Sequence, residues 1–229
     1  MLVLFDIDDT LIDHTSAVET GVATLHAELG VSTELSAFHE SWVAAMLEHF
    51  PRYLRGELTY EEQRRARLRR TIDQNLSDAE ADDSFEHYFR AYQAAWSLFP
   101  DVLSCLAALS SHTLGIISNG NGLEQREKLA RTGIADRFQS VIISADCGHA
   151  KPDAEIFRLA CRGLASGHRD AVYIGDLYEI DAVGARAAGL AGIWLDRRSL
   201  RRSDHVPPII RNLDELPVLL HSHGIQRSL

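Results

Sequence analysis

The chain has 229 residues, 45% of them hydrophobic, and a formal net charge of -10 at pH 7. This length allows one full-sized domain with a small accessory domain. The acidic balance argues against sequence-independent binding to nucleic acid or to an anionic membrane, because both need clustered positive charge. We therefore expect a small, separate ligand, and no nucleic-acid or membrane partner.

The cysteines and the apolar runs indicate the cellular compartment of the protein. Cys105, Cys147 and Cys161 are widely spaced and odd in number, which fits neither a disulfide framework nor a CxxC metal pattern. A reducing, cytoplasmic environment is the prediction. The apolar run after Met1 is only four residues long and has no basic leader, so we expect no signal sequence, and no other stretch could span a bilayer. Both a monomer and a homodimer are compatible with the sequence.

Short apolar runs predict the strands of a sheet. Continuous runs of this kind suit a parallel sheet that is covered on both faces. In chain order they are Leu2–Phe5, Thr113–Ser118, Val141–Ser144, Ala171–Gly175 and Gly192–Asp196. Segments with helical periodicity separate the later runs. This alternation predicts an α/β fold with a doubly wound, Rossmann-like parallel sheet.

The alternation stops between about residue 14 and residue 99, where the pattern is that of four helices without a convincing strand. This predicts an all-helical insertion, with a cap domain at residues 15–98 and a catalytic core at residues 1–14 and 99–229. The S/T-x-x-E capping box, at Thr59–Glu62 and again at Ser77–Glu80, marks two helix starts. Stops and turns are expected at Gly30, Pro51 and Gly56.

Aromatic and basic side chains of the insertion are interpreted mainly as structural. Phe85, Tyr88, Phe89, Tyr92 and Trp96 recur at spacings of three or four, which puts them on one packed helix face. The arginines between residues 64 and 70 wrap around their helix and are expected to form a solvated face, partly paired with Glu61. Segment 51–56 is either an interhelical turn or a place where an arginine meets a substrate anion.

The first strand leads directly into Asp6-Ile7-Asp8-Asp9-Thr10. In an extended segment residues two apart point the same way, so Asp6 and Asp8 share a face at the carboxyl end of a strand, where open α/β sheets bind ligands. A calcium loop is excluded because Leu11 and Ala17 stand where it needs glycine and glutamate. The motif alone leaves helix capping, a solvated turn and catalysis open.

Three later segments also lie at or just beyond the ends of predicted strands. Ser118-Asn119-Gly120 offers a hydroxyl and a glycine-permitted turn whose donors can converge on a phosphate oxygen. In Lys151-Pro152-Asp153 the proline is expected in a first helical turn, where it fixes the approach of the lysine. Gly175-Asp176, with Asp181 five residues on, can hold a hard cation. Each of these segments alone is also compatible with a plain surface turn.

Together, the order Asp-x-Asp-x-Thr, Ser, Lys-Pro, Gly-Asp-x-x-x-x-Asp resembles the four motifs of the haloacid dehalogenase superfamily, in its phosphatase branch. The resemblance covers the core, and the helical insertion is similar in position and character to that family's first type of cap. It implies that Asp6 is the nucleophile, Asp8 the general acid/base, and Ser118 and Lys151 the phosphate binders.

The resemblance also implies a metal site and further contacts to the substrate. Mg²⁺ would be held by the Asp6 and Asp176 carboxylates and the Asp8 carbonyl. Thr10, Asn119 and Gly120, within the same motifs, are the expected substrate-binding residues. Asp181 would support either Lys151 or a metal-bound water.

The chemistry explains this combination of residue types. An aspartate that attacks a phosphate dianion brings like charges to about 3.5 Å, which costs about 5 kcal/mol per charge pair at an effective dielectric of about 20. A magnesium ion and Lys151 supply the cancelling charge, and Ser118 adds a donor. Asp8 would protonate the leaving oxygen and, once ionised, activate water.

Three functions follow as hypotheses. The first is hydrolysis of a small phosphorylated metabolite, such as a sugar phosphate, phosphoglycolate or a nucleotide, through an aspartyl-phosphate. The second is a phosphomutase on the same scaffold, and the third is a non-catalytic binding protein. Dehalogenation is disfavoured, because the dehalogenase branch has no acid two residues after the nucleophile.

Overall fold

The computed structural model describes residues 1–162, 170–199 and 207–222. The chain divides into two compact units, Met1–Asp13 with Leu98–Leu229 and His14–Ser97. We call them the sheet unit and the helical unit. Their roles as catalytic core and cap stay predictions. No helix among the described residues is long and apolar enough to cross a bilayer.

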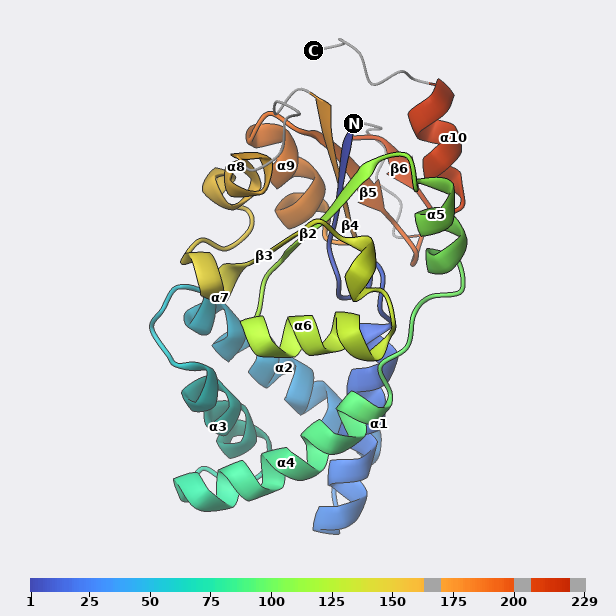
Figure 1. Ribbon diagram of the computed structural model, residues 1–229. Coiled ribbons are helices and arrows are strands. Elements are labelled where there is room, and N and C mark those ends of the chain that lie inside the picture. Colours follow the sequence, from blue (N-terminus) through green and yellow to red (C-terminus); the bar gives the residue numbers. More distant parts are fainter. Residues whose placement is uncertain (163–169, 200–206, 223–229) are drawn as a thin grey trace. The chain divides into compact units, whose positions relative to one another are not determined.

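The sheet unit is built on one parallel sheet of six strands in the order β3-β2-β1-β4-β5-β6 (Figure 1). This confirms the predicted doubly wound fold. The strands are β1 (Leu2–Phe5), β2 (Thr113–Ser118), β3 (Ser140–Ile143), β4 (Ala171–Gly175), β5 (Ala191–Leu195) and β6 (Ile209–Ile210). Two of the predicted strands, β3 and β5, begin and end one residue earlier than expected. The sequence does not predict β6, because two residues are too few to form a pattern.

Helices cover both faces of this sheet. Between successive strands of this unit lie α5 (Val102–Ala108), α6 (Gly122–Arg131), η1 (Ala135–Arg137), α7 (Ser144–Cys147), α8 (Ala154–Arg162), η3 (Tyr178–Val183) and α9 (Gly184–Ala187). Helix α10 (Glu215–Ser222) follows β6. In Figure 1, α8 and α9 lie on one side of the sheet, and α5 and α10 on the other. The buried strand β1 shows why: Val3 and Phe5 pack into one hydrophobic cluster, and Leu2 and Leu4 into a second.

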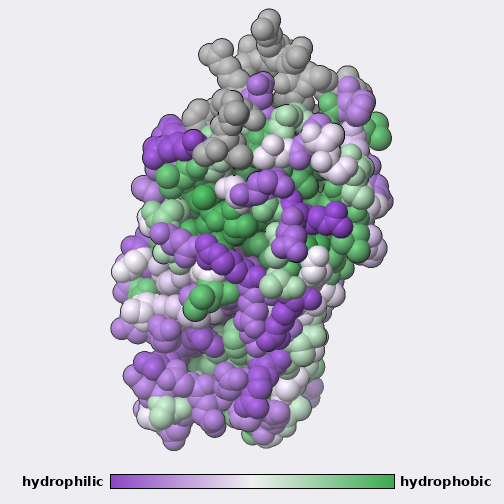
Figure 2. All heavy atoms as spheres, viewed as in Figure 1, coloured by the Kyte–Doolittle hydropathy of each residue, from purple (hydrophilic) through white to green (hydrophobic). Residues whose placement is uncertain are grey.

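The helical unit consists of α1 (His14–Leu29), α2 (Leu35–Leu54), α3 (Tyr60–Thr71) and α4 (Asp78–Ala94). Both predicted capping boxes are present, with Thr59 and Ser77 accepting from the backbone N–H groups of Glu62 and Glu80. The aromatic face of α4 is packed as predicted, and Phe85 and Tyr88 contact Trp42 of α2. On the face that Figure 2 shows, the surface of these helices is mostly hydrophilic.

Two predictions for the helical unit are wrong. Pro51 does not end a helix but lies inside α2, which continues to Leu54. Proline there removes one hydrogen bond of the helix, and α2 ends three residues later. The basic run is not simply a solvated face: Arg67 is buried, with its guanidinium over the ring of Trp42.

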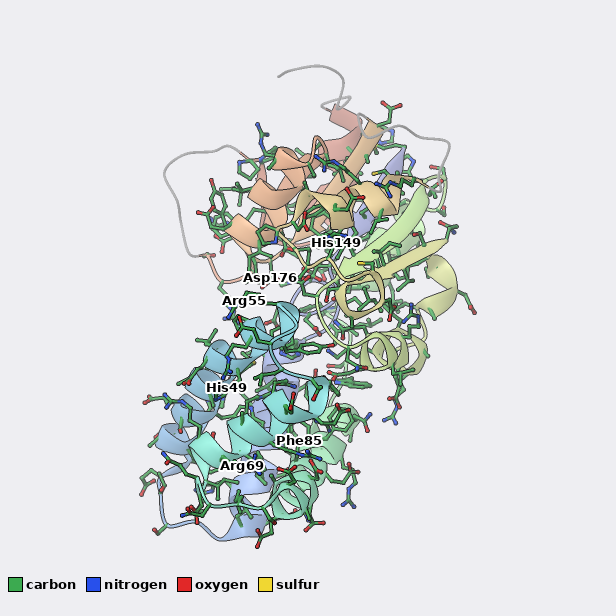
Figure 3. The ribbon with its side chains drawn as sticks, turned by 90° about the vertical axis from the view of Figure 1, so that its left-hand side faces the viewer. His49, Arg55, Arg69, Phe85, His149 and Asp176 are labelled. Atoms are coloured by element: carbon green, nitrogen blue, oxygen red, sulfur yellow. The ribbon has the colours of Figure 1, made fainter. Side chains whose placement is uncertain are left out.

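Two half-buried arginines of α3 also have partners other than Glu61. Arg65 binds Asp78 and Asp82 of α4, and Arg69 binds Asp78. Figure 3 shows Arg69 on α3 and Phe85 on α4. Arg52 and Arg55 both pair with Glu57 nearby, which fits the interhelical turn. Folding of α3 against α4 therefore decides which acids these arginines meet.

An ion pair between a buried aspartate and a half-buried arginine joins distant parts of the sheet unit. Arg197, just after β5, donates two hydrogen bonds to Asp101 at 2.8 and 3.0 Å and one to the carbonyl of Thr10 at 2.9 Å. The N–H of Leu213 donates to the same carboxylate at 2.7 Å. Burial alone would raise the pKa of Asp101, but Arg197 and the Leu213 N–H outweigh it and hold the pKa below its ordinary value.

We predict that Asp101→Asn lowers the free energy of unfolding by about 3 kcal/mol at pH 7, because it breaks a buried pair. A lowered carboxyl pKa stabilises the fold fully above the unfolded value of about 3.9, and this contribution is lost as pH falls through the folded value. Urea denaturation of both proteins should therefore show a difference that shrinks toward pH 3. The exposed Asp136→Asn serves as the control. A difference independent of pH would contradict the prediction.

Candidate active site

The predicted motif residues gather at the carboxyl ends of three neighbouring strands. Asp6 follows β1, and Ser118 is the last residue of β2. Gly175 is the last residue of β4, and Asp176 follows it. The parallel register places Phe5 beside Ile116 and Ile174, so the residues after each strand meet at one edge of the sheet. The N–H of Asp6 donates to the carbonyl of Ile174 at 2.9 Å and fixes the backbone there.

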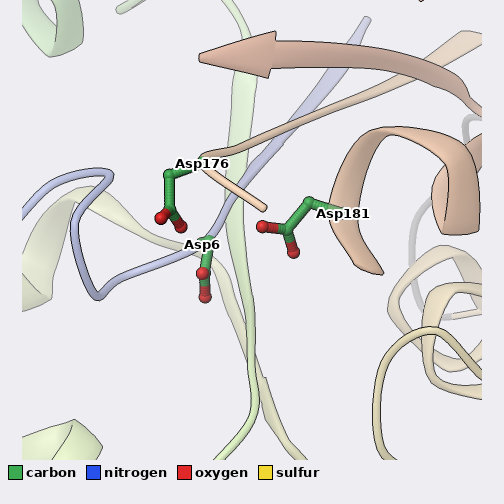
Figure 4. Close-up of side chains that lie close together, drawn as sticks. All are labelled: Asp6, Asp176 and Asp181. Atoms are coloured by element: carbon green, nitrogen blue, oxygen red, sulfur yellow. The ribbon is translucent and has the colours of Figure 1, made fainter. Parts of the chain in front are cut away.

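Three carboxylates converge at this edge. Asp6, Asp176 and Asp181 each offer an oxygen, and these oxygens lie within 4.8 Å of one another (Figure 4). Burial raises the pKa of Asp6 to about 7 against the opposing effect of Lys151, and Asp181 and Asp8 add to the rise. Burial raises the pKa of Asp176 well above its ordinary value, and Asp181, Asp6 and Asp9 add to the rise. Burial and mutual repulsion therefore disfavour the ionised form of both carboxyls.

Lys151 is the cation closest to this cluster among the described residues. Its ammonium lies 2.8 Å from Asp6 Oδ1, 2.8 Å from Asp181 Oδ1 and 2.7 Å from the hydroxyl of Tyr173. Burial alone would lower the pKa of this ammonium, but Asp181 and Asp6 outweigh it and hold the pKa above its ordinary value. The lysine is thus charged and fixed beside the proposed nucleophile.

Asp181 pairs with this lysine from a buried position. It is fully buried; its Oδ1 receives Lys151, and its Oδ2 accepts from the N–H of Leu177 at 2.9 Å. Gly175 allows this approach, since a Cβ at that position would lie 2.4 Å from the Asp181 carboxyl carbon. In this structure the side chain thus pairs with Lys151, and the prediction that it supports either this lysine or a metal-bound water stays a prediction.

The three predicted substrate-binding residues differ in their contacts and burial. Gly120 has a φ of 148°, which favours glycine, and its N–H donates to the Ser144 hydroxyl at 2.9 Å. The side-chain amide of Asn119 exchanges two hydrogen bonds with the peptide of Lys151, at 2.8 and 3.0 Å. Thr10 is fully buried. Asn119 thus holds the Lys151 loop in place.

The prediction that Pro152 lies in the first turn of a helix is wrong. Pro152 lies before α8, which begins at Ala154.

Asp8 lies apart from the three clustered carboxylates. Its Oδ1 pairs with Lys128 at 2.7 Å, and its Oδ2 accepts from the amide of Gln125 at 2.9 Å. Gln125 and Lys128 were not predicted as site residues. Their spacing of three on α6 shows that they share a helix face, but a glutamine and a lysine at this spacing are common on solvated helices. Only the packing of α6 on the sheet brings them to the site.

The comparison with known proteins agrees with the geometry. A family model of haloacid dehalogenase-like hydrolases matches residues 1–189. The chain belongs to this family. It is 28% identical over 226 residues to pyrimidine 5′-nucleotidase YjjG from Escherichia coli K12, which covers 96% of this chain and 98% of that protein. It is 30% identical over 220 residues to a glyceraldehyde 3-phosphate phosphatase from Methanopyrus kandleri, which covers 94% and 90%.

Solved structures of this family share the fold. The hydrolase YfnB from Bacillus subtilis, whose structure was determined with magnesium bound, superposes with a TM-score of 0.79 over 96% of this chain and 97% of that chain, at 22% identity. Structures of 2-haloacid dehalogenases are also similar to this haloacid dehalogenase-like hydrolase. The family is therefore established, and the choice between its reactions depends on the site.

The acidic cluster of this haloacid dehalogenase-like hydrolase fits a hard divalent cation. Asp6 and Asp176 supply carboxylate oxygens, which Mg²⁺ prefers. Both carboxyls have raised pKa values, first because they are buried and further because acids lie beside them, and a cation would offset both effects. The Asp8 carboxylate lies outside this group, so its part in the metal site stays the prediction that its main-chain carbonyl is a ligand.

We predict that Mg²⁺ raises the melting temperature more at pH 8 than at pH 6. A raised carboxyl pKa means that the folded, metal-free protein loses stability as pH rises through about 7, where Asp6 ionises. The cation removes this penalty by taking the place of the proton. Thermal denaturation with Mg²⁺ and with EDTA measures the effect. Asp6→Asn should abolish the pH dependence, while Asp136→Asn keeps it; an equal shift at both pH values would contradict the prediction.

Proposed function

We propose that this chain is a magnesium-dependent phosphatase that hydrolyses a small phosphate monoester through an aspartyl-phosphate on Asp6. The observation that carries the proposal is the separate pairing of two carboxylates after one strand. Asp6 lies 2.8 Å from Lys151, and Asp8 lies 2.7 Å from Lys128. Each acid thus has its own cation, which suits two different roles in one reaction.

The first half of the proposed reaction forms a covalent intermediate. A carboxylate oxygen of Asp6 attacks phosphorus, and the bond from phosphorus to the leaving oxygen breaks. Asp8 gives its proton to that oxygen, which departs as an alcohol. Lys151 and the Ser118 hydroxyl bind phosphoryl oxygens and stabilise the charge that develops there. A bound Mg²⁺ would supply further positive charge for the same oxygens, with Asp6 and Asp176 as its carboxylate ligands.

The second half returns the enzyme to its starting state. Asp8, now ionised, takes a proton from water, and the oxygen of that water attacks phosphorus. The bond from Asp6 to phosphorus breaks, inorganic phosphate leaves, and Asp8 again carries a proton. Atoms and protons balance over the cycle, because one ester and one water give one alcohol and one phosphate. The same residue therefore serves first as an acid and then as a base.

Other functions of this scaffold give different products. A 2-haloacid dehalogenase would release halide from a compound such as 2-chloropropionate, and Asp8 argues against it. A phosphomutase would return the phosphoryl group to a bound sugar, so the product would be an isomer rather than free phosphate. A non-catalytic binding protein would show no turnover in the presence of magnesium. Assays for halide, isomer and phosphate separate these outcomes.

We predict that the protein releases phosphate from at least one member of a panel of metabolite phosphates, and only with Mg²⁺. The panel should contain pyrimidine 5′-nucleotides and glyceraldehyde 3-phosphate, the substrates in the names of two relatives, together with sugar phosphates and phosphoglycolate. Asp6→Asn should lower kcat by about 10⁴-fold or more, because it removes the nucleophile. Asp136→Asn is the control. Phosphate release that survives in Asp6→Asn would overturn the aspartyl-phosphate mechanism.

A further inference from the structure

Helix α6 (Gly122–Arg131) carries two polar side chains that lie deep in the sheet unit. Lys128 and Gln125 are only 1% and 2% exposed. Asn121 caps the start of the helix, and its side-chain oxygen accepts hydrogen bonds from the N–H groups of Leu123 and Glu124. Lysine and glutamine are rarely buried to this degree without a specific partner. The burial of these two side chains therefore points to specific partners inside the sheet unit.

The partner of Lys128 is the second aspartate of the first motif. Its ammonium lies 2.7 Å from Asp8 Oδ1 and 3.3 Å from Glu124 Oε1. Burial alone would lower the pKa of this ammonium, but Asp8 and Glu124 outweigh it and hold the pKa above its ordinary value. The Asp8 side chain is itself 25% exposed, so the lysine is the anchored end of the pair. The buried Lys128 of α6 therefore holds the partly exposed Asp8 carboxylate in place.

Gln125 connects this carboxylate to the proposed phosphate binder. Its amide nitrogen donates to Asp8 Oδ2 at 2.9 Å and to Ser118 Oγ at 2.7 Å. Because the amide N–H group uses an acceptor lone pair of the serine, the hydroxyl hydrogen of Ser118 points elsewhere. A phosphoryl oxygen at the site would be an acceptor for that hydrogen. Gln125 thus fixes the position of the Ser118 hydroxyl and leaves its hydrogen to donate to another group.

We infer that Lys128 and Gln125 are positioning residues for the reaction: Lys128 aims the Asp8 carboxylate at the leaving oxygen, and Gln125 joins it to Ser118 with the serine hydrogen directed to the phosphoryl group. This inference rests on the proposed phosphatase function. It assigns to α6 a role that none of the four motifs contains. Both residues act through Asp8 and Ser118, and neither is proposed to contact the reacting atoms.

The two residues should affect different steps. Loss of Lys128 disorders the acid, which matters most when the leaving group is a poor one that needs a proton. An aryl phosphate with an acidic phenol, such as p-nitrophenyl phosphate, departs without that help. Loss of Gln125 weakens the hold of Ser118 on phosphate, which affects binding. The leaving-group dependence and the split between kcat and KM therefore distinguish these roles from a general loss of stability.

The test compares kcat/KM for glyceraldehyde 3-phosphate, or the best alkyl phosphate of the panel, with kcat/KM for p-nitrophenyl phosphate, because kcat/KM reports the first half of the reaction and leaves out the shared hydrolysis of the aspartyl-phosphate. Lys128→Met should lower kcat/KM about 100-fold on the alkyl ester and less than about tenfold on the aryl ester. Lys128→Arg should restore part of the loss, because it keeps the charge. Arg131→Met on the exposed side of the same helix should leave both values unchanged. The ratio within one variant does not depend on the fraction of folded protein.

Gln125→Leu should raise KM and the inhibition constant of inorganic phosphate about tenfold, with a smaller effect on kcat. Gln125→Glu should do the same, because its carboxylate would accept the Ser118 hydrogen and repel Asp8. An equal loss on alkyl and aryl esters in Lys128→Met, or unchanged phosphate inhibition in both Gln125 variants, would overturn the inference. If the wild-type protein turned over no phosphate ester at all, the proposed function would fail before any variant was compared.

Discussion

The arrangement of the site depends on one buried ammonium, that of Lys151. It joins the carboxylate that follows β1 to Asp181 of η3 and to the hydroxyl of Tyr173 on β4. Its own peptide is held by Asn119 at the end of β2. Removal of the lysine would leave Asp6 and Asp181 buried without a compensating charge, which costs several kcal/mol. The ends of three strands are therefore held together by the same charge that the proposed chemistry needs.

Close backbone approach makes this ion pair possible. A side chain at Gly175 would occupy the place of the Asp181 carboxyl group, and one at Gly192 of β5 would lie 2.0 Å from the carbonyl of Ala182. Both glycines let η3 pack directly against β4 and β5. Asp181 then reaches Lys151 from a buried position, where its charge is not screened by water. Gly175 of the fourth motif and Gly192 of β5 thus leave the space in which Asp181 meets Lys151.

Two lysines divide the acidic residues of the first motif between them. Lys151 pairs with Asp6, and Lys128 pairs with Asp8, although the two aspartates are only two residues apart. The two ammonium groups come from different segments, one before α8 and one in α6. This separation gives neighbouring carboxylates different environments, which is the physical requirement for a nucleophile and an acid/base in one site. It also links the proposed acid to Ser118 through Gln125.

The sequence alone determined the class of the fold and the chemical groups of the site. Apolar runs marked five of the six strands, capping boxes marked two helix starts, and the carboxyl ends of β1, β2 and β4 located Asp6, Ser118 and Asp176. These features are local, because a strand or a cap depends on residues close together in the chain. Only the tertiary structure decided the partners. Lys128, Gln125 and Tyr173 reach the site through packing, and Arg67 is buried by Trp42, because contacts between distant segments leave no periodic pattern in the sequence.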